Sequence, residues 1–358
     1  GMKSYIVLLL NALFVISFFP CFGQNPKVLF ALHGGAGTIL KKNMTPEKEK
    51  QYREKLEEAA LEGFEVLQSG GSSITAVQAA INILEDSPLF NAGRGSVYNY
   101  EGEIENDASI MDGHSLEAGA VCGVQNIKNP INAALAVLMH SNHVMLSGSG
   151  ATDFAKKHEV EFARPEWFQT EKRYNSLQKV KERLKEEQNG EKGKGSDQKD
   201  KDNSSGYNPD YLDFNDYKYG TVGAVALDLN GNLAAGTSTG GMTNKRFGRI
   251  GDSPVIGAGT YANNKTCAVS STGHGEYFIR LAVAFQIAAA MEYGKMGLQE
   301  AVNVVILTKL TQLGGKGGVI ALDKKGNVAM RFNTPGMYRA FVAENGEVTV
   351  KLYGEDEE

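Results

Sequence analysis

The chain has 358 residues, is 42% hydrophobic and 22% charged, and carries a net charge of −5 at pH 7. These values are typical of a globular protein, and the acidic balance argues against nucleic acid as a partner, because phosphate binding requires concentrated Lys and Arg. Small-molecule or peptide chemistry is the better expectation. The 42 glycines exceed the roughly 25 of average usage and indicate tight turns and close backbone approaches.

Residues 1–23 have the composition of a leader rather than of a folded segment. Gly1, ahead of the first methionine, resembles a cloning remnant, and Lys3 precedes an apolar run, residues 5–19, that is followed by a short exit to Gly23. This run is shorter than the ~20 residues that span a bilayer. The pattern predicts a secretory signal peptide, export to the periplasm or the medium, and no membrane partner once the peptide is removed.

The next part of the chain predicts alternating strands and helices. In chain order we expect a strand over 28–32, a glycine-rich loop over 33–37, a helix that begins after Thr45 and ends at Gly70, a helix over 74–84, glycine-rich strands and turns over 90–124, and a helix over 130–139.

A composition change separates this part from the rest. Residues 189–209 contain no aliphatic side chain and cannot bury enough surface to offset their ordering entropy, so they predict a mobile charged tether. Hairpins over 222–239 and 319–330 follow it, with helices over 276–291 and 298–313 between them. Together the elements predict an α+β protein with helices outside and sheets inside.

Cys122 and Cys267 both lie in apolar stretches of the mature chain. Their surroundings match no metal-binding or redox motif, so we expect two buried free thiols.

One hypothesis for the chemistry is an α/β-hydrolase. Residues 236–240 fit the G-x-S-x-G pattern around Ser238, and Asp252 and His274 follow in the order of a triad. However, a nucleophile elbow must turn into a helix, whereas residues 241–251 contain three glycines and no apolar stripe. The hypothesis is therefore disfavoured.

The better hypothesis starts at Thr221. An alcohol is a weak nucleophile unless a base lies beside it, and the residue's own α-amine can be that base once a cut makes it a chain start. A tether that ends at Gly220, followed at once by a threonine that opens a strand, is what self-cleavage between these two residues would leave.

Several motifs extend this hypothesis, and their order and intervals resemble the plant-type asparaginase and isoaspartyl peptidase family of N-terminal-nucleophile hydrolases. The motifs are His33-Gly-Gly-Ala-Gly, Leu84-Glu-Asp-Ser-Pro-Leu-Phe90-Asn-Ala-Gly-Arg-Gly-Ser, Asp107-Ala-Ser-Ile-Met-Asp-Gly113, Gly220-Thr-Val-Gly-Ala-Val-Ala-Leu-Asp, Thr237-Ser-Thr-Gly-Gly, Arg249-Ile-Gly-Asp-Ser-Pro, Ser271-Thr-Gly-His-Gly-Glu276 and Phe332-Asn-Thr-Pro-Gly-Met337.

The resemblance implies a four-layer αββα sandwich and autocleavage into an α subunit, residues 24–220, and a β subunit, residues 221–358. It implies hydrolysis of L-asparagine and β-aspartyl dipeptides, and two αβ pairs in the assembly. The long charged tether departs from shorter versions of the family and leaves its trimming open.

The resemblance also assigns roles to residues of this chain. It implies that Thr221 is the nucleophile. The other implied roles are a hydroxyl partner for it (Thr239), support of the nucleophile region (Asn91), oxyanion donors (Thr272 and the Gly273 N–H), an α-carboxylate ligand (Arg249) and α-ammonium ligands (Asp252 and the Gly275 carbonyl). His274 receives no catalytic role and is interpreted as structural.

The resemblance implies no catalytic cofactor, but it does imply a structural sodium ion. Its ligands would be backbone carbonyls, which leave no side-chain signature in the sequence: Leu84, Glu85, Ser87, Phe90, Ala92 and Arg94.

Two alternatives stay open. Glycosylasparaginases share the Thr, Arg and Asp layout, although the glycine-rich motif at His33 favours the isoaspartyl branch. The chain could instead be a binding protein whose tether is never cut, in which case a denaturing gel would show a single band.

Overall fold

The computed structural model describes residues 27–191 and 220–354, and residues 1–26, 192–219 and 355–358 lie outside it. Two β-sheets form its centre. In spatial order the larger sheet contains β12 (Val348–Tyr353), β11 (Gly336–Val342), β1 (Leu29–Gly37), β5 (Val222–Leu227), β6 (Leu233–Thr239), β2 (Asn106–Asp112), β3 (Ala118–Val124) and β4 (Met145–Ser147). The smaller contains β10 (Val328–Phe332), β9 (Gly317–Asp323), β8 (Cys267–Gly273) and β7 (Thr260–Ala262). All neighbours pair antiparallel except β3 and β4.

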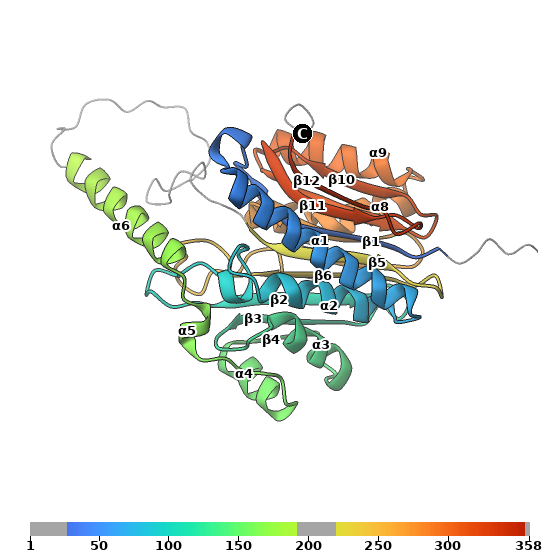
Figure 1. Cartoon of the computed structure of the whole chain (residues 1–358), viewed down its shortest axis with the longest axis horizontal. Helices are drawn as coiled ribbons and strands as arrows, with labels where there is room; N and C mark the ends of the chain where they lie inside the picture. Colours follow the sequence, from blue (N-terminus) through green and yellow to red (C-terminus); the bar gives the residue numbers. More distant parts are fainter. Residues whose placement is uncertain (1–26, 192–219, 355–358) are drawn as a thin grey trace, which may run out of the picture.

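Helices precede and follow the hairpin of β5 and β6 in the chain (Figure 1). Those before it are η1 (Lys41–Asn43), α1 (Pro46–Gln68), α2 (Ser73–Glu85), η2 (Gly93–Gly95), α3 (Pro130–His140), α4 (Gly148–Lys157), α5 (Pro165–Phe168) and α6 (Glu171–Glu191). Those after it are α7 (Gly275–Leu281), α8 (Val283–Glu292), α9 (Leu298–Val302), the π-helix η4 (Asn303–Leu310) and α10 (Thr311–Leu313).

The central strands β1, β5, β6 and β9 are buried on both faces, and alternate residues enter different cores. On β5, Ala224 and Ala226 belong to the core shared with α1, α2 and α3, whereas Val225 belongs to the core between the two sheets. On β9, Ile320 faces this inter-sheet core and Val319 faces the core with α8, α9 and η4. This alternation follows from the two-residue period of a strand. The expectation of a mixed α and β protein is confirmed.

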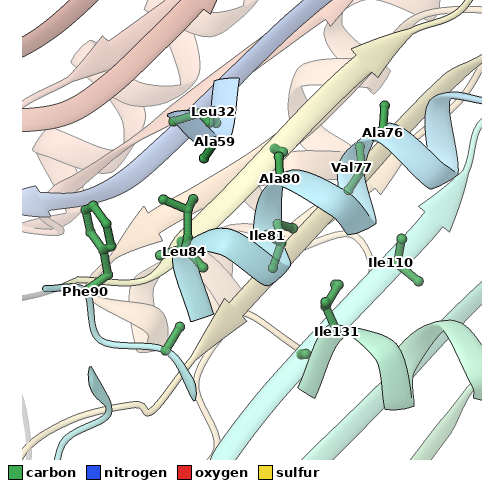
Figure 2. Close-up of a cluster of buried hydrophobic side chains, with 14 of the residues drawn as sticks. Leu32, Ala59, Ala76, Val77, Ala80, Ile81, Leu84, Phe90, Ile110 and Ile131 are labelled. Atoms are coloured by element: carbon green, nitrogen blue, oxygen red, sulfur yellow. The ribbon is translucent and has the colours of Figure 1, made fainter. Parts of the chain in front are cut away.

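Helix α2 shows how the first core is filled. Its small and branched residues, Ala76, Val77, Ala80, Ile81 and Leu84, lie along the face that packs over the larger sheet (Figure 2). The spacing of three and four residues produces one apolar stripe. This packing fixes the C-terminal end of α2. The segment that follows α2 contributes to the site described below.

Two predicted elements differ from the structure. Residues 33–37 were predicted as a loop, but they continue β1, because their backbone groups pair with β11, with a register shift between His33 and Gly35. The helix predicted over 276–291 is broken at Ala282, which has a φ of 47° and separates α7 from α8. The apolar periodicity of a sequence does not reveal a residue with a left-handed backbone conformation, so the break at Ala282 was not predicted.

The N-cap at Thr45 is confirmed, since its hydroxyl accepts a hydrogen bond from the Lys48 N–H. Cys122 and Cys267 are both buried and free, as expected. The first three residues of the predicted tether end helix α6, and residues 192–209 lie outside the described residues, as does the predicted signal peptide. No helix within 27–191 and 220–354 combines the length and apolar character needed to cross a membrane.

Candidate active site

Two threonine hydroxyls meet where β5 begins and β6 ends. Val222 pairs with Ser238 in the antiparallel register, so Thr221 and Thr239 lie opposite each other. The Oγ1 atom of Thr221 donates a hydrogen bond of 3.0 Å to Oγ1 of Thr239. Both residues are buried. The pairing predicted for these hydroxyls is therefore present.

Asn91 holds the backbone on both sides of this threonine pair. Its N–H donates to the Gly220 carbonyl at 2.9 Å, and its own carbonyl accepts from the Gly240 N–H at 3.0 Å. Its side chain donates to the Gly241 carbonyl at 2.7 Å and accepts from the Val97 N–H at 3.0 Å. Asn91 thus fixes the carbonyl of the Gly220–Thr221 peptide bond.

A third strand end contributes Thr272 and Gly273. Both lie at the end of β8, and Thr272 is fully buried. Its Oγ1 accepts a hydrogen bond of 3.2 Å from the Ala36 N–H of β1. Because that bond uses a lone pair, the hydroxyl proton of Thr272 stays available for another acceptor.

Arg249 is held by Glu276 in a two-point ion pair. Its Nε donates to Oε1 of Glu276 at 2.8 Å and its Nη2 donates to Oε2 at 2.9 Å. Although burial opposes ionisation, this pairing lowers the pKa of Glu276 below its ordinary value. The pair occupies one edge of the guanidinium and leaves the Nη1 and Nη2 edge for a second two-oxygen ligand. Sequence reasoning missed Glu276, because a single acid in a motif does not reveal its partner.

Asp252 is a buried carboxylate with unused hydrogen-bonding capacity. It is 4% exposed, and within the described part of the chain its Oδ2 atom has no hydrogen-bond partner. Burial raises the pKa of Asp252 to about 7, while the charge of Arg249 opposes that rise. A Cβ at Gly275 would lie 2.9 Å from both Asp252 Oδ1 and Arg249 Nη2, so the structure brings these three residues together.

Gly241 connects the charged group to the threonine pair. Its N–H donates to Thr239 Oγ1 at 3.1 Å, and a Cβ at this position would lie 3.6 Å from Arg249 Nη1. A hydroxyl pair, a cation with an open edge and a carboxylate with an unpartnered oxygen therefore surround one region. Such a set suits a small ligand that carries a carboxylate and an ammonium group.

The residues of the disfavoured α/β-hydrolase hypothesis do not form a triad. Ser238 is buried within β6 and donates to Oε1 of Glu85 at 2.6 Å, so it is not presented on an exposed elbow. His274 lies 3.6 Å from Glu276 Oε2, measured from its Nε2 atom. Burial lowers the pKa of His274 to about 4, so its ring is neutral at pH 7.

The predicted cation loop runs from the end of α2 into η2. A Cβ on Gly93, which has a φ of +53°, would lie 2.5 Å from the Glu85 carbonyl oxygen, and one on Gly95 would collide with that of Phe90. Because these glycines have no Cβ, the loop can fold back on itself, and the carbonyl oxygens of Glu85 and Phe90 can lie close to its glycine backbone. Among the described residues, no cluster of three or more His, Cys, Asp or Glu side chains could hold a metal.

A family model described as asparaginase matches residues 26–352 of the chain. Among curated proteins, the isoaspartyl peptidase of Escherichia coli is 46% identical, covering 92% of this chain and 97% of its own length. That of Salmonella typhimurium is 45% identical, with 92% and 99% covered. The isoaspartyl peptidase/L-asparaginase of Xenopus laevis is 40% identical, with 89% and 93% covered.

Proposed function

Since the chain belongs to the asparaginase family, we propose that it hydrolyses the β-amide bond of β-aspartyl dipeptides and of L-asparagine. The observation that carries this proposal is the group formed by Arg249, Asp252 and Gly275 beside the threonine pair. Arg249 would hold the substrate's α-carboxylate with its open edge. The unpartnered Asp252 oxygen and the Gly275 carbonyl would hold its α-ammonium.

The reaction begins with Thr221 as the first residue of its subunit. Its α-amine takes the proton from Oγ1, which attacks the side-chain amide carbon of the substrate. Thr239 orients this hydroxyl, while the Thr272 hydroxyl and the Gly273 N–H donate to the developing oxyanion, at roughly 2.7–4 kcal/mol for one such donor in other acyl-transfer enzymes. The Thr221 ammonium passes this proton to the amide nitrogen of the substrate, the C–N bond breaks, and ammonia or the second amino acid leaves. Water then hydrolyses the ester, which releases L-aspartate and restores the Thr221 hydroxyl.

The Thr221 hydroxyl would also cut the Gly220–Thr221 peptide bond and so free the α-amine of Thr221. Oγ1 of Thr221 attacks the carbonyl carbon of Gly220, the peptide bond becomes an ester, and water cleaves that ester. The Asn91 N–H, 2.9 Å from the Gly220 oxygen, would polarise this carbonyl.

Cleavage would give the α subunit, residues 24–220, and the β subunit, residues 221–358, which stay together and pair as (αβ)2. The three cores support an αββα sandwich for this fold. The signal-peptide pattern of residues 1–23 supports the proposed export to the periplasm or the medium.

The test compares two isomeric dipeptides under identical conditions. We expect β-Asp-Leu to be cleaved at least about 100-fold faster than α-Asp-Leu, because only in the β-linked isomer are the α-carboxylate and the α-ammonium of the aspartyl residue both free. Measured kcat/KM values check this, and equal values would reject the proposal. Turnover of a glycan-linked asparagine in preference to both dipeptides would favour a glycosylasparaginase. An uncut chain with neither activity would favour a binding protein.

We also propose that the loop after α2 holds a structural sodium ion. Its ligands would be the backbone carbonyls of Leu84, Glu85, Ser87, Phe90, Ala92 and Arg94. Carbonyl oxygens suit a hard monovalent cation, and the glycines of the loop permit their close approach. The ion would stabilise the loop that carries Asn91 and takes no part in the reaction.

Sodium is therefore expected to raise the Tm. At a concentration about 100 times Kd, binding would add about 2.7 kcal/mol to the stability of the folded state. Thermal unfolding in sodium chloride and in N-methylglucamine chloride of equal ionic strength measures the difference. Gly93→Ala should abolish it, because the new Cβ would meet the Glu85 carbonyl. Gly102→Ala, at a φ of +88° with open space around it, is the matched control. A Tm independent of sodium in the parent protein would refute the site.

A further inference from the structure

A buried histidine lies directly behind the proposed nucleophile. His33 belongs to β1, pairs in register with Gly223 of β5 and is fully buried. Its Nδ1 atom is 3.0 Å from the carbonyl oxygen of Thr221, and its Nε2 atom is 2.9 Å from Oγ of Ser270 on β8. The ring therefore bridges the two sheets immediately next to Thr221.

These contacts permit only one arrangement of protons. A carbonyl oxygen can only accept, so the hydrogen bond requires a proton on Nδ1. Burial lowers the pKa of His33 to about 3, so the ring is neutral and Nε2 carries a lone pair. Ser270 must then donate its hydroxyl proton to Nε2. The Thr221 carbonyl thus fixes the tautomer of His33, and the Ser270 hydroxyl supplies the donor that this tautomer needs at Nε2.

More buried hydroxyls continue behind Ser270. Its Oγ atom is 2.7 Å from Oγ1 of Thr237, which accepts from Thr260 at 2.6 Å. Ser109 Oγ lies 2.8 Å from Thr260 Oγ1 and 2.6 Å from the Ser253 carbonyl oxygen, next to the proposed ammonium ligand. A line of polar groups inside an apolar core is costly unless each is satisfied. This line is satisfied.

The space for the bridge is provided by Gly223. A Cβ at this position would lie 2.6 Å from His33 Nε2 and would collide with Ser270 Oγ. Any larger residue would therefore separate the ring from its donor. Both the glycine and the histidine lie close to Thr221 in the fold, yet neither has a role in the reaction described above.

We propose that His33 is a positioning residue for the N-terminal nucleophile: its Nδ1–H anchors the Thr221 carbonyl, and the Ser270 hydroxyl fixes the ring. The inference rests on the proposed function of Thr221. After cleavage, Thr221 has no preceding residue to hold it, so its orientation depends on its strand, its hydroxyl partner and this carbonyl. An anchor on the carbonyl limits rotation of the residue that supplies both the nucleophile and the base, and small misplacements of reacting groups cost large factors in rate.

The test compares two replacements of similar shape. His33→Asn can place an amide N–H where Nδ1 lies, whereas His33→Leu cannot. We expect the Asn variant to exceed the Leu variant at least about tenfold in kcat for β-Asp-Leu, or in the rate of chain cleavage if the variants are still being processed. We expect their KM values to agree within about twofold. Equal rates for the two variants would overturn the proposal.

A second pair keeps the test decisive if neither His33 variant folds. Ser270→Ala removes the donor to Nε2, and Ser271→Ala removes an equally buried hydroxyl of the same strand that donates instead to the Ala258 carbonyl. Ser270→Ala should lower kcat severalfold at unchanged KM, and Ser271→Ala should leave both unchanged. Equal kcat values in this pair would also overturn the proposal. The proposed function would still stand if the parent cleaved β-Asp-Leu and Thr221→Ala were inactive.

Discussion

Thr221→Ala is expected to leave the chain in one piece and without measurable hydrolysis of β-Asp-Leu, a loss of at least about 10⁴-fold in kcat. Both reactions use the same hydroxyl, which lies 3.0 Å from Thr239 Oγ1, and alanine offers no atom to replace it. Folding should be little affected, because one hydrogen bond contributes about 1 kcal/mol. A denaturing gel and the mass of each fragment measure cleavage, and the parent should yield a fragment that begins at Thr221.

Two further variants separate the hydroxyl from its surroundings. Thr221→Ser keeps the nucleophilic oxygen and should still be cut and active. Thr266→Ala removes another buried threonine hydroxyl, one that has no hydrogen-bond partner in the described structure, and should behave like the parent. Cleavage of Thr221→Ala at the usual position would mean that another group or another protein performs the cut.

The local elements were predictable because they depend on neighbouring residues. Helix α2 follows from its apolar stripe, and the hairpin of β5 and β6 follows from two apolar runs around an Asn-Gly turn. The order of eight strands in one sheet was not, since it depends on pairings between residues hundreds of positions apart, such as β1 with β11. For the same reason, residues 33–37 could not be recognised as strand.

The sequence allowed us to predict which residues form the site, but not the hydrogen bonds and ion pairs between them. Resemblance to the family selected Arg249 and Asp252, and the structure places them together around Gly275. Glu276 and His33 both lie inside the motifs that carried the resemblance, yet their roles depend on partners from other elements. An ion pair with Arg249 or a bridge to Ser270 exists only after the sheets have packed.

Arg249→Lys is expected to lower kcat/KM for β-Asp-Leu at least about tenfold, equivalent to about 1.4 kcal/mol, mainly through KM. In the structure Arg249 uses Nε and Nη2 for Glu276, and its remaining edge can still grip two carboxylate oxygens. A lysine ammonium has no such second edge and cannot satisfy Glu276 and the substrate with the same geometry. Chain cleavage should be unchanged, because it involves no substrate carboxylate. Arg246→Lys, in the same loop but stacked on Tyr100, is the control and should stay within about twofold of the parent.

The pH dependence provides an independent readout of the same pair. Asp252 must be ionised to accept the substrate ammonium, and burial raises its pKa to about 7. As the pH falls below about 7, Asp252 gains a proton and kcat/KM should fall with it. Bound ammonium keeps the carboxylate ionised, so kcat should lack this limb. The Thr221 amine, whose ordinary pKa is about 7.7–8.0, contributes to both kcat and kcat/KM. Arg249→Leu removes the cation that lowers the Asp252 pKa, and the limb should move to higher pH. Two results together would contradict the proposal: an acid limb at the same pH in Arg249→Leu, and an unchanged kcat/KM in Arg249→Lys. They would mean that Arg249 and Asp252 do not bind the α-carboxylate and the α-ammonium of the substrate.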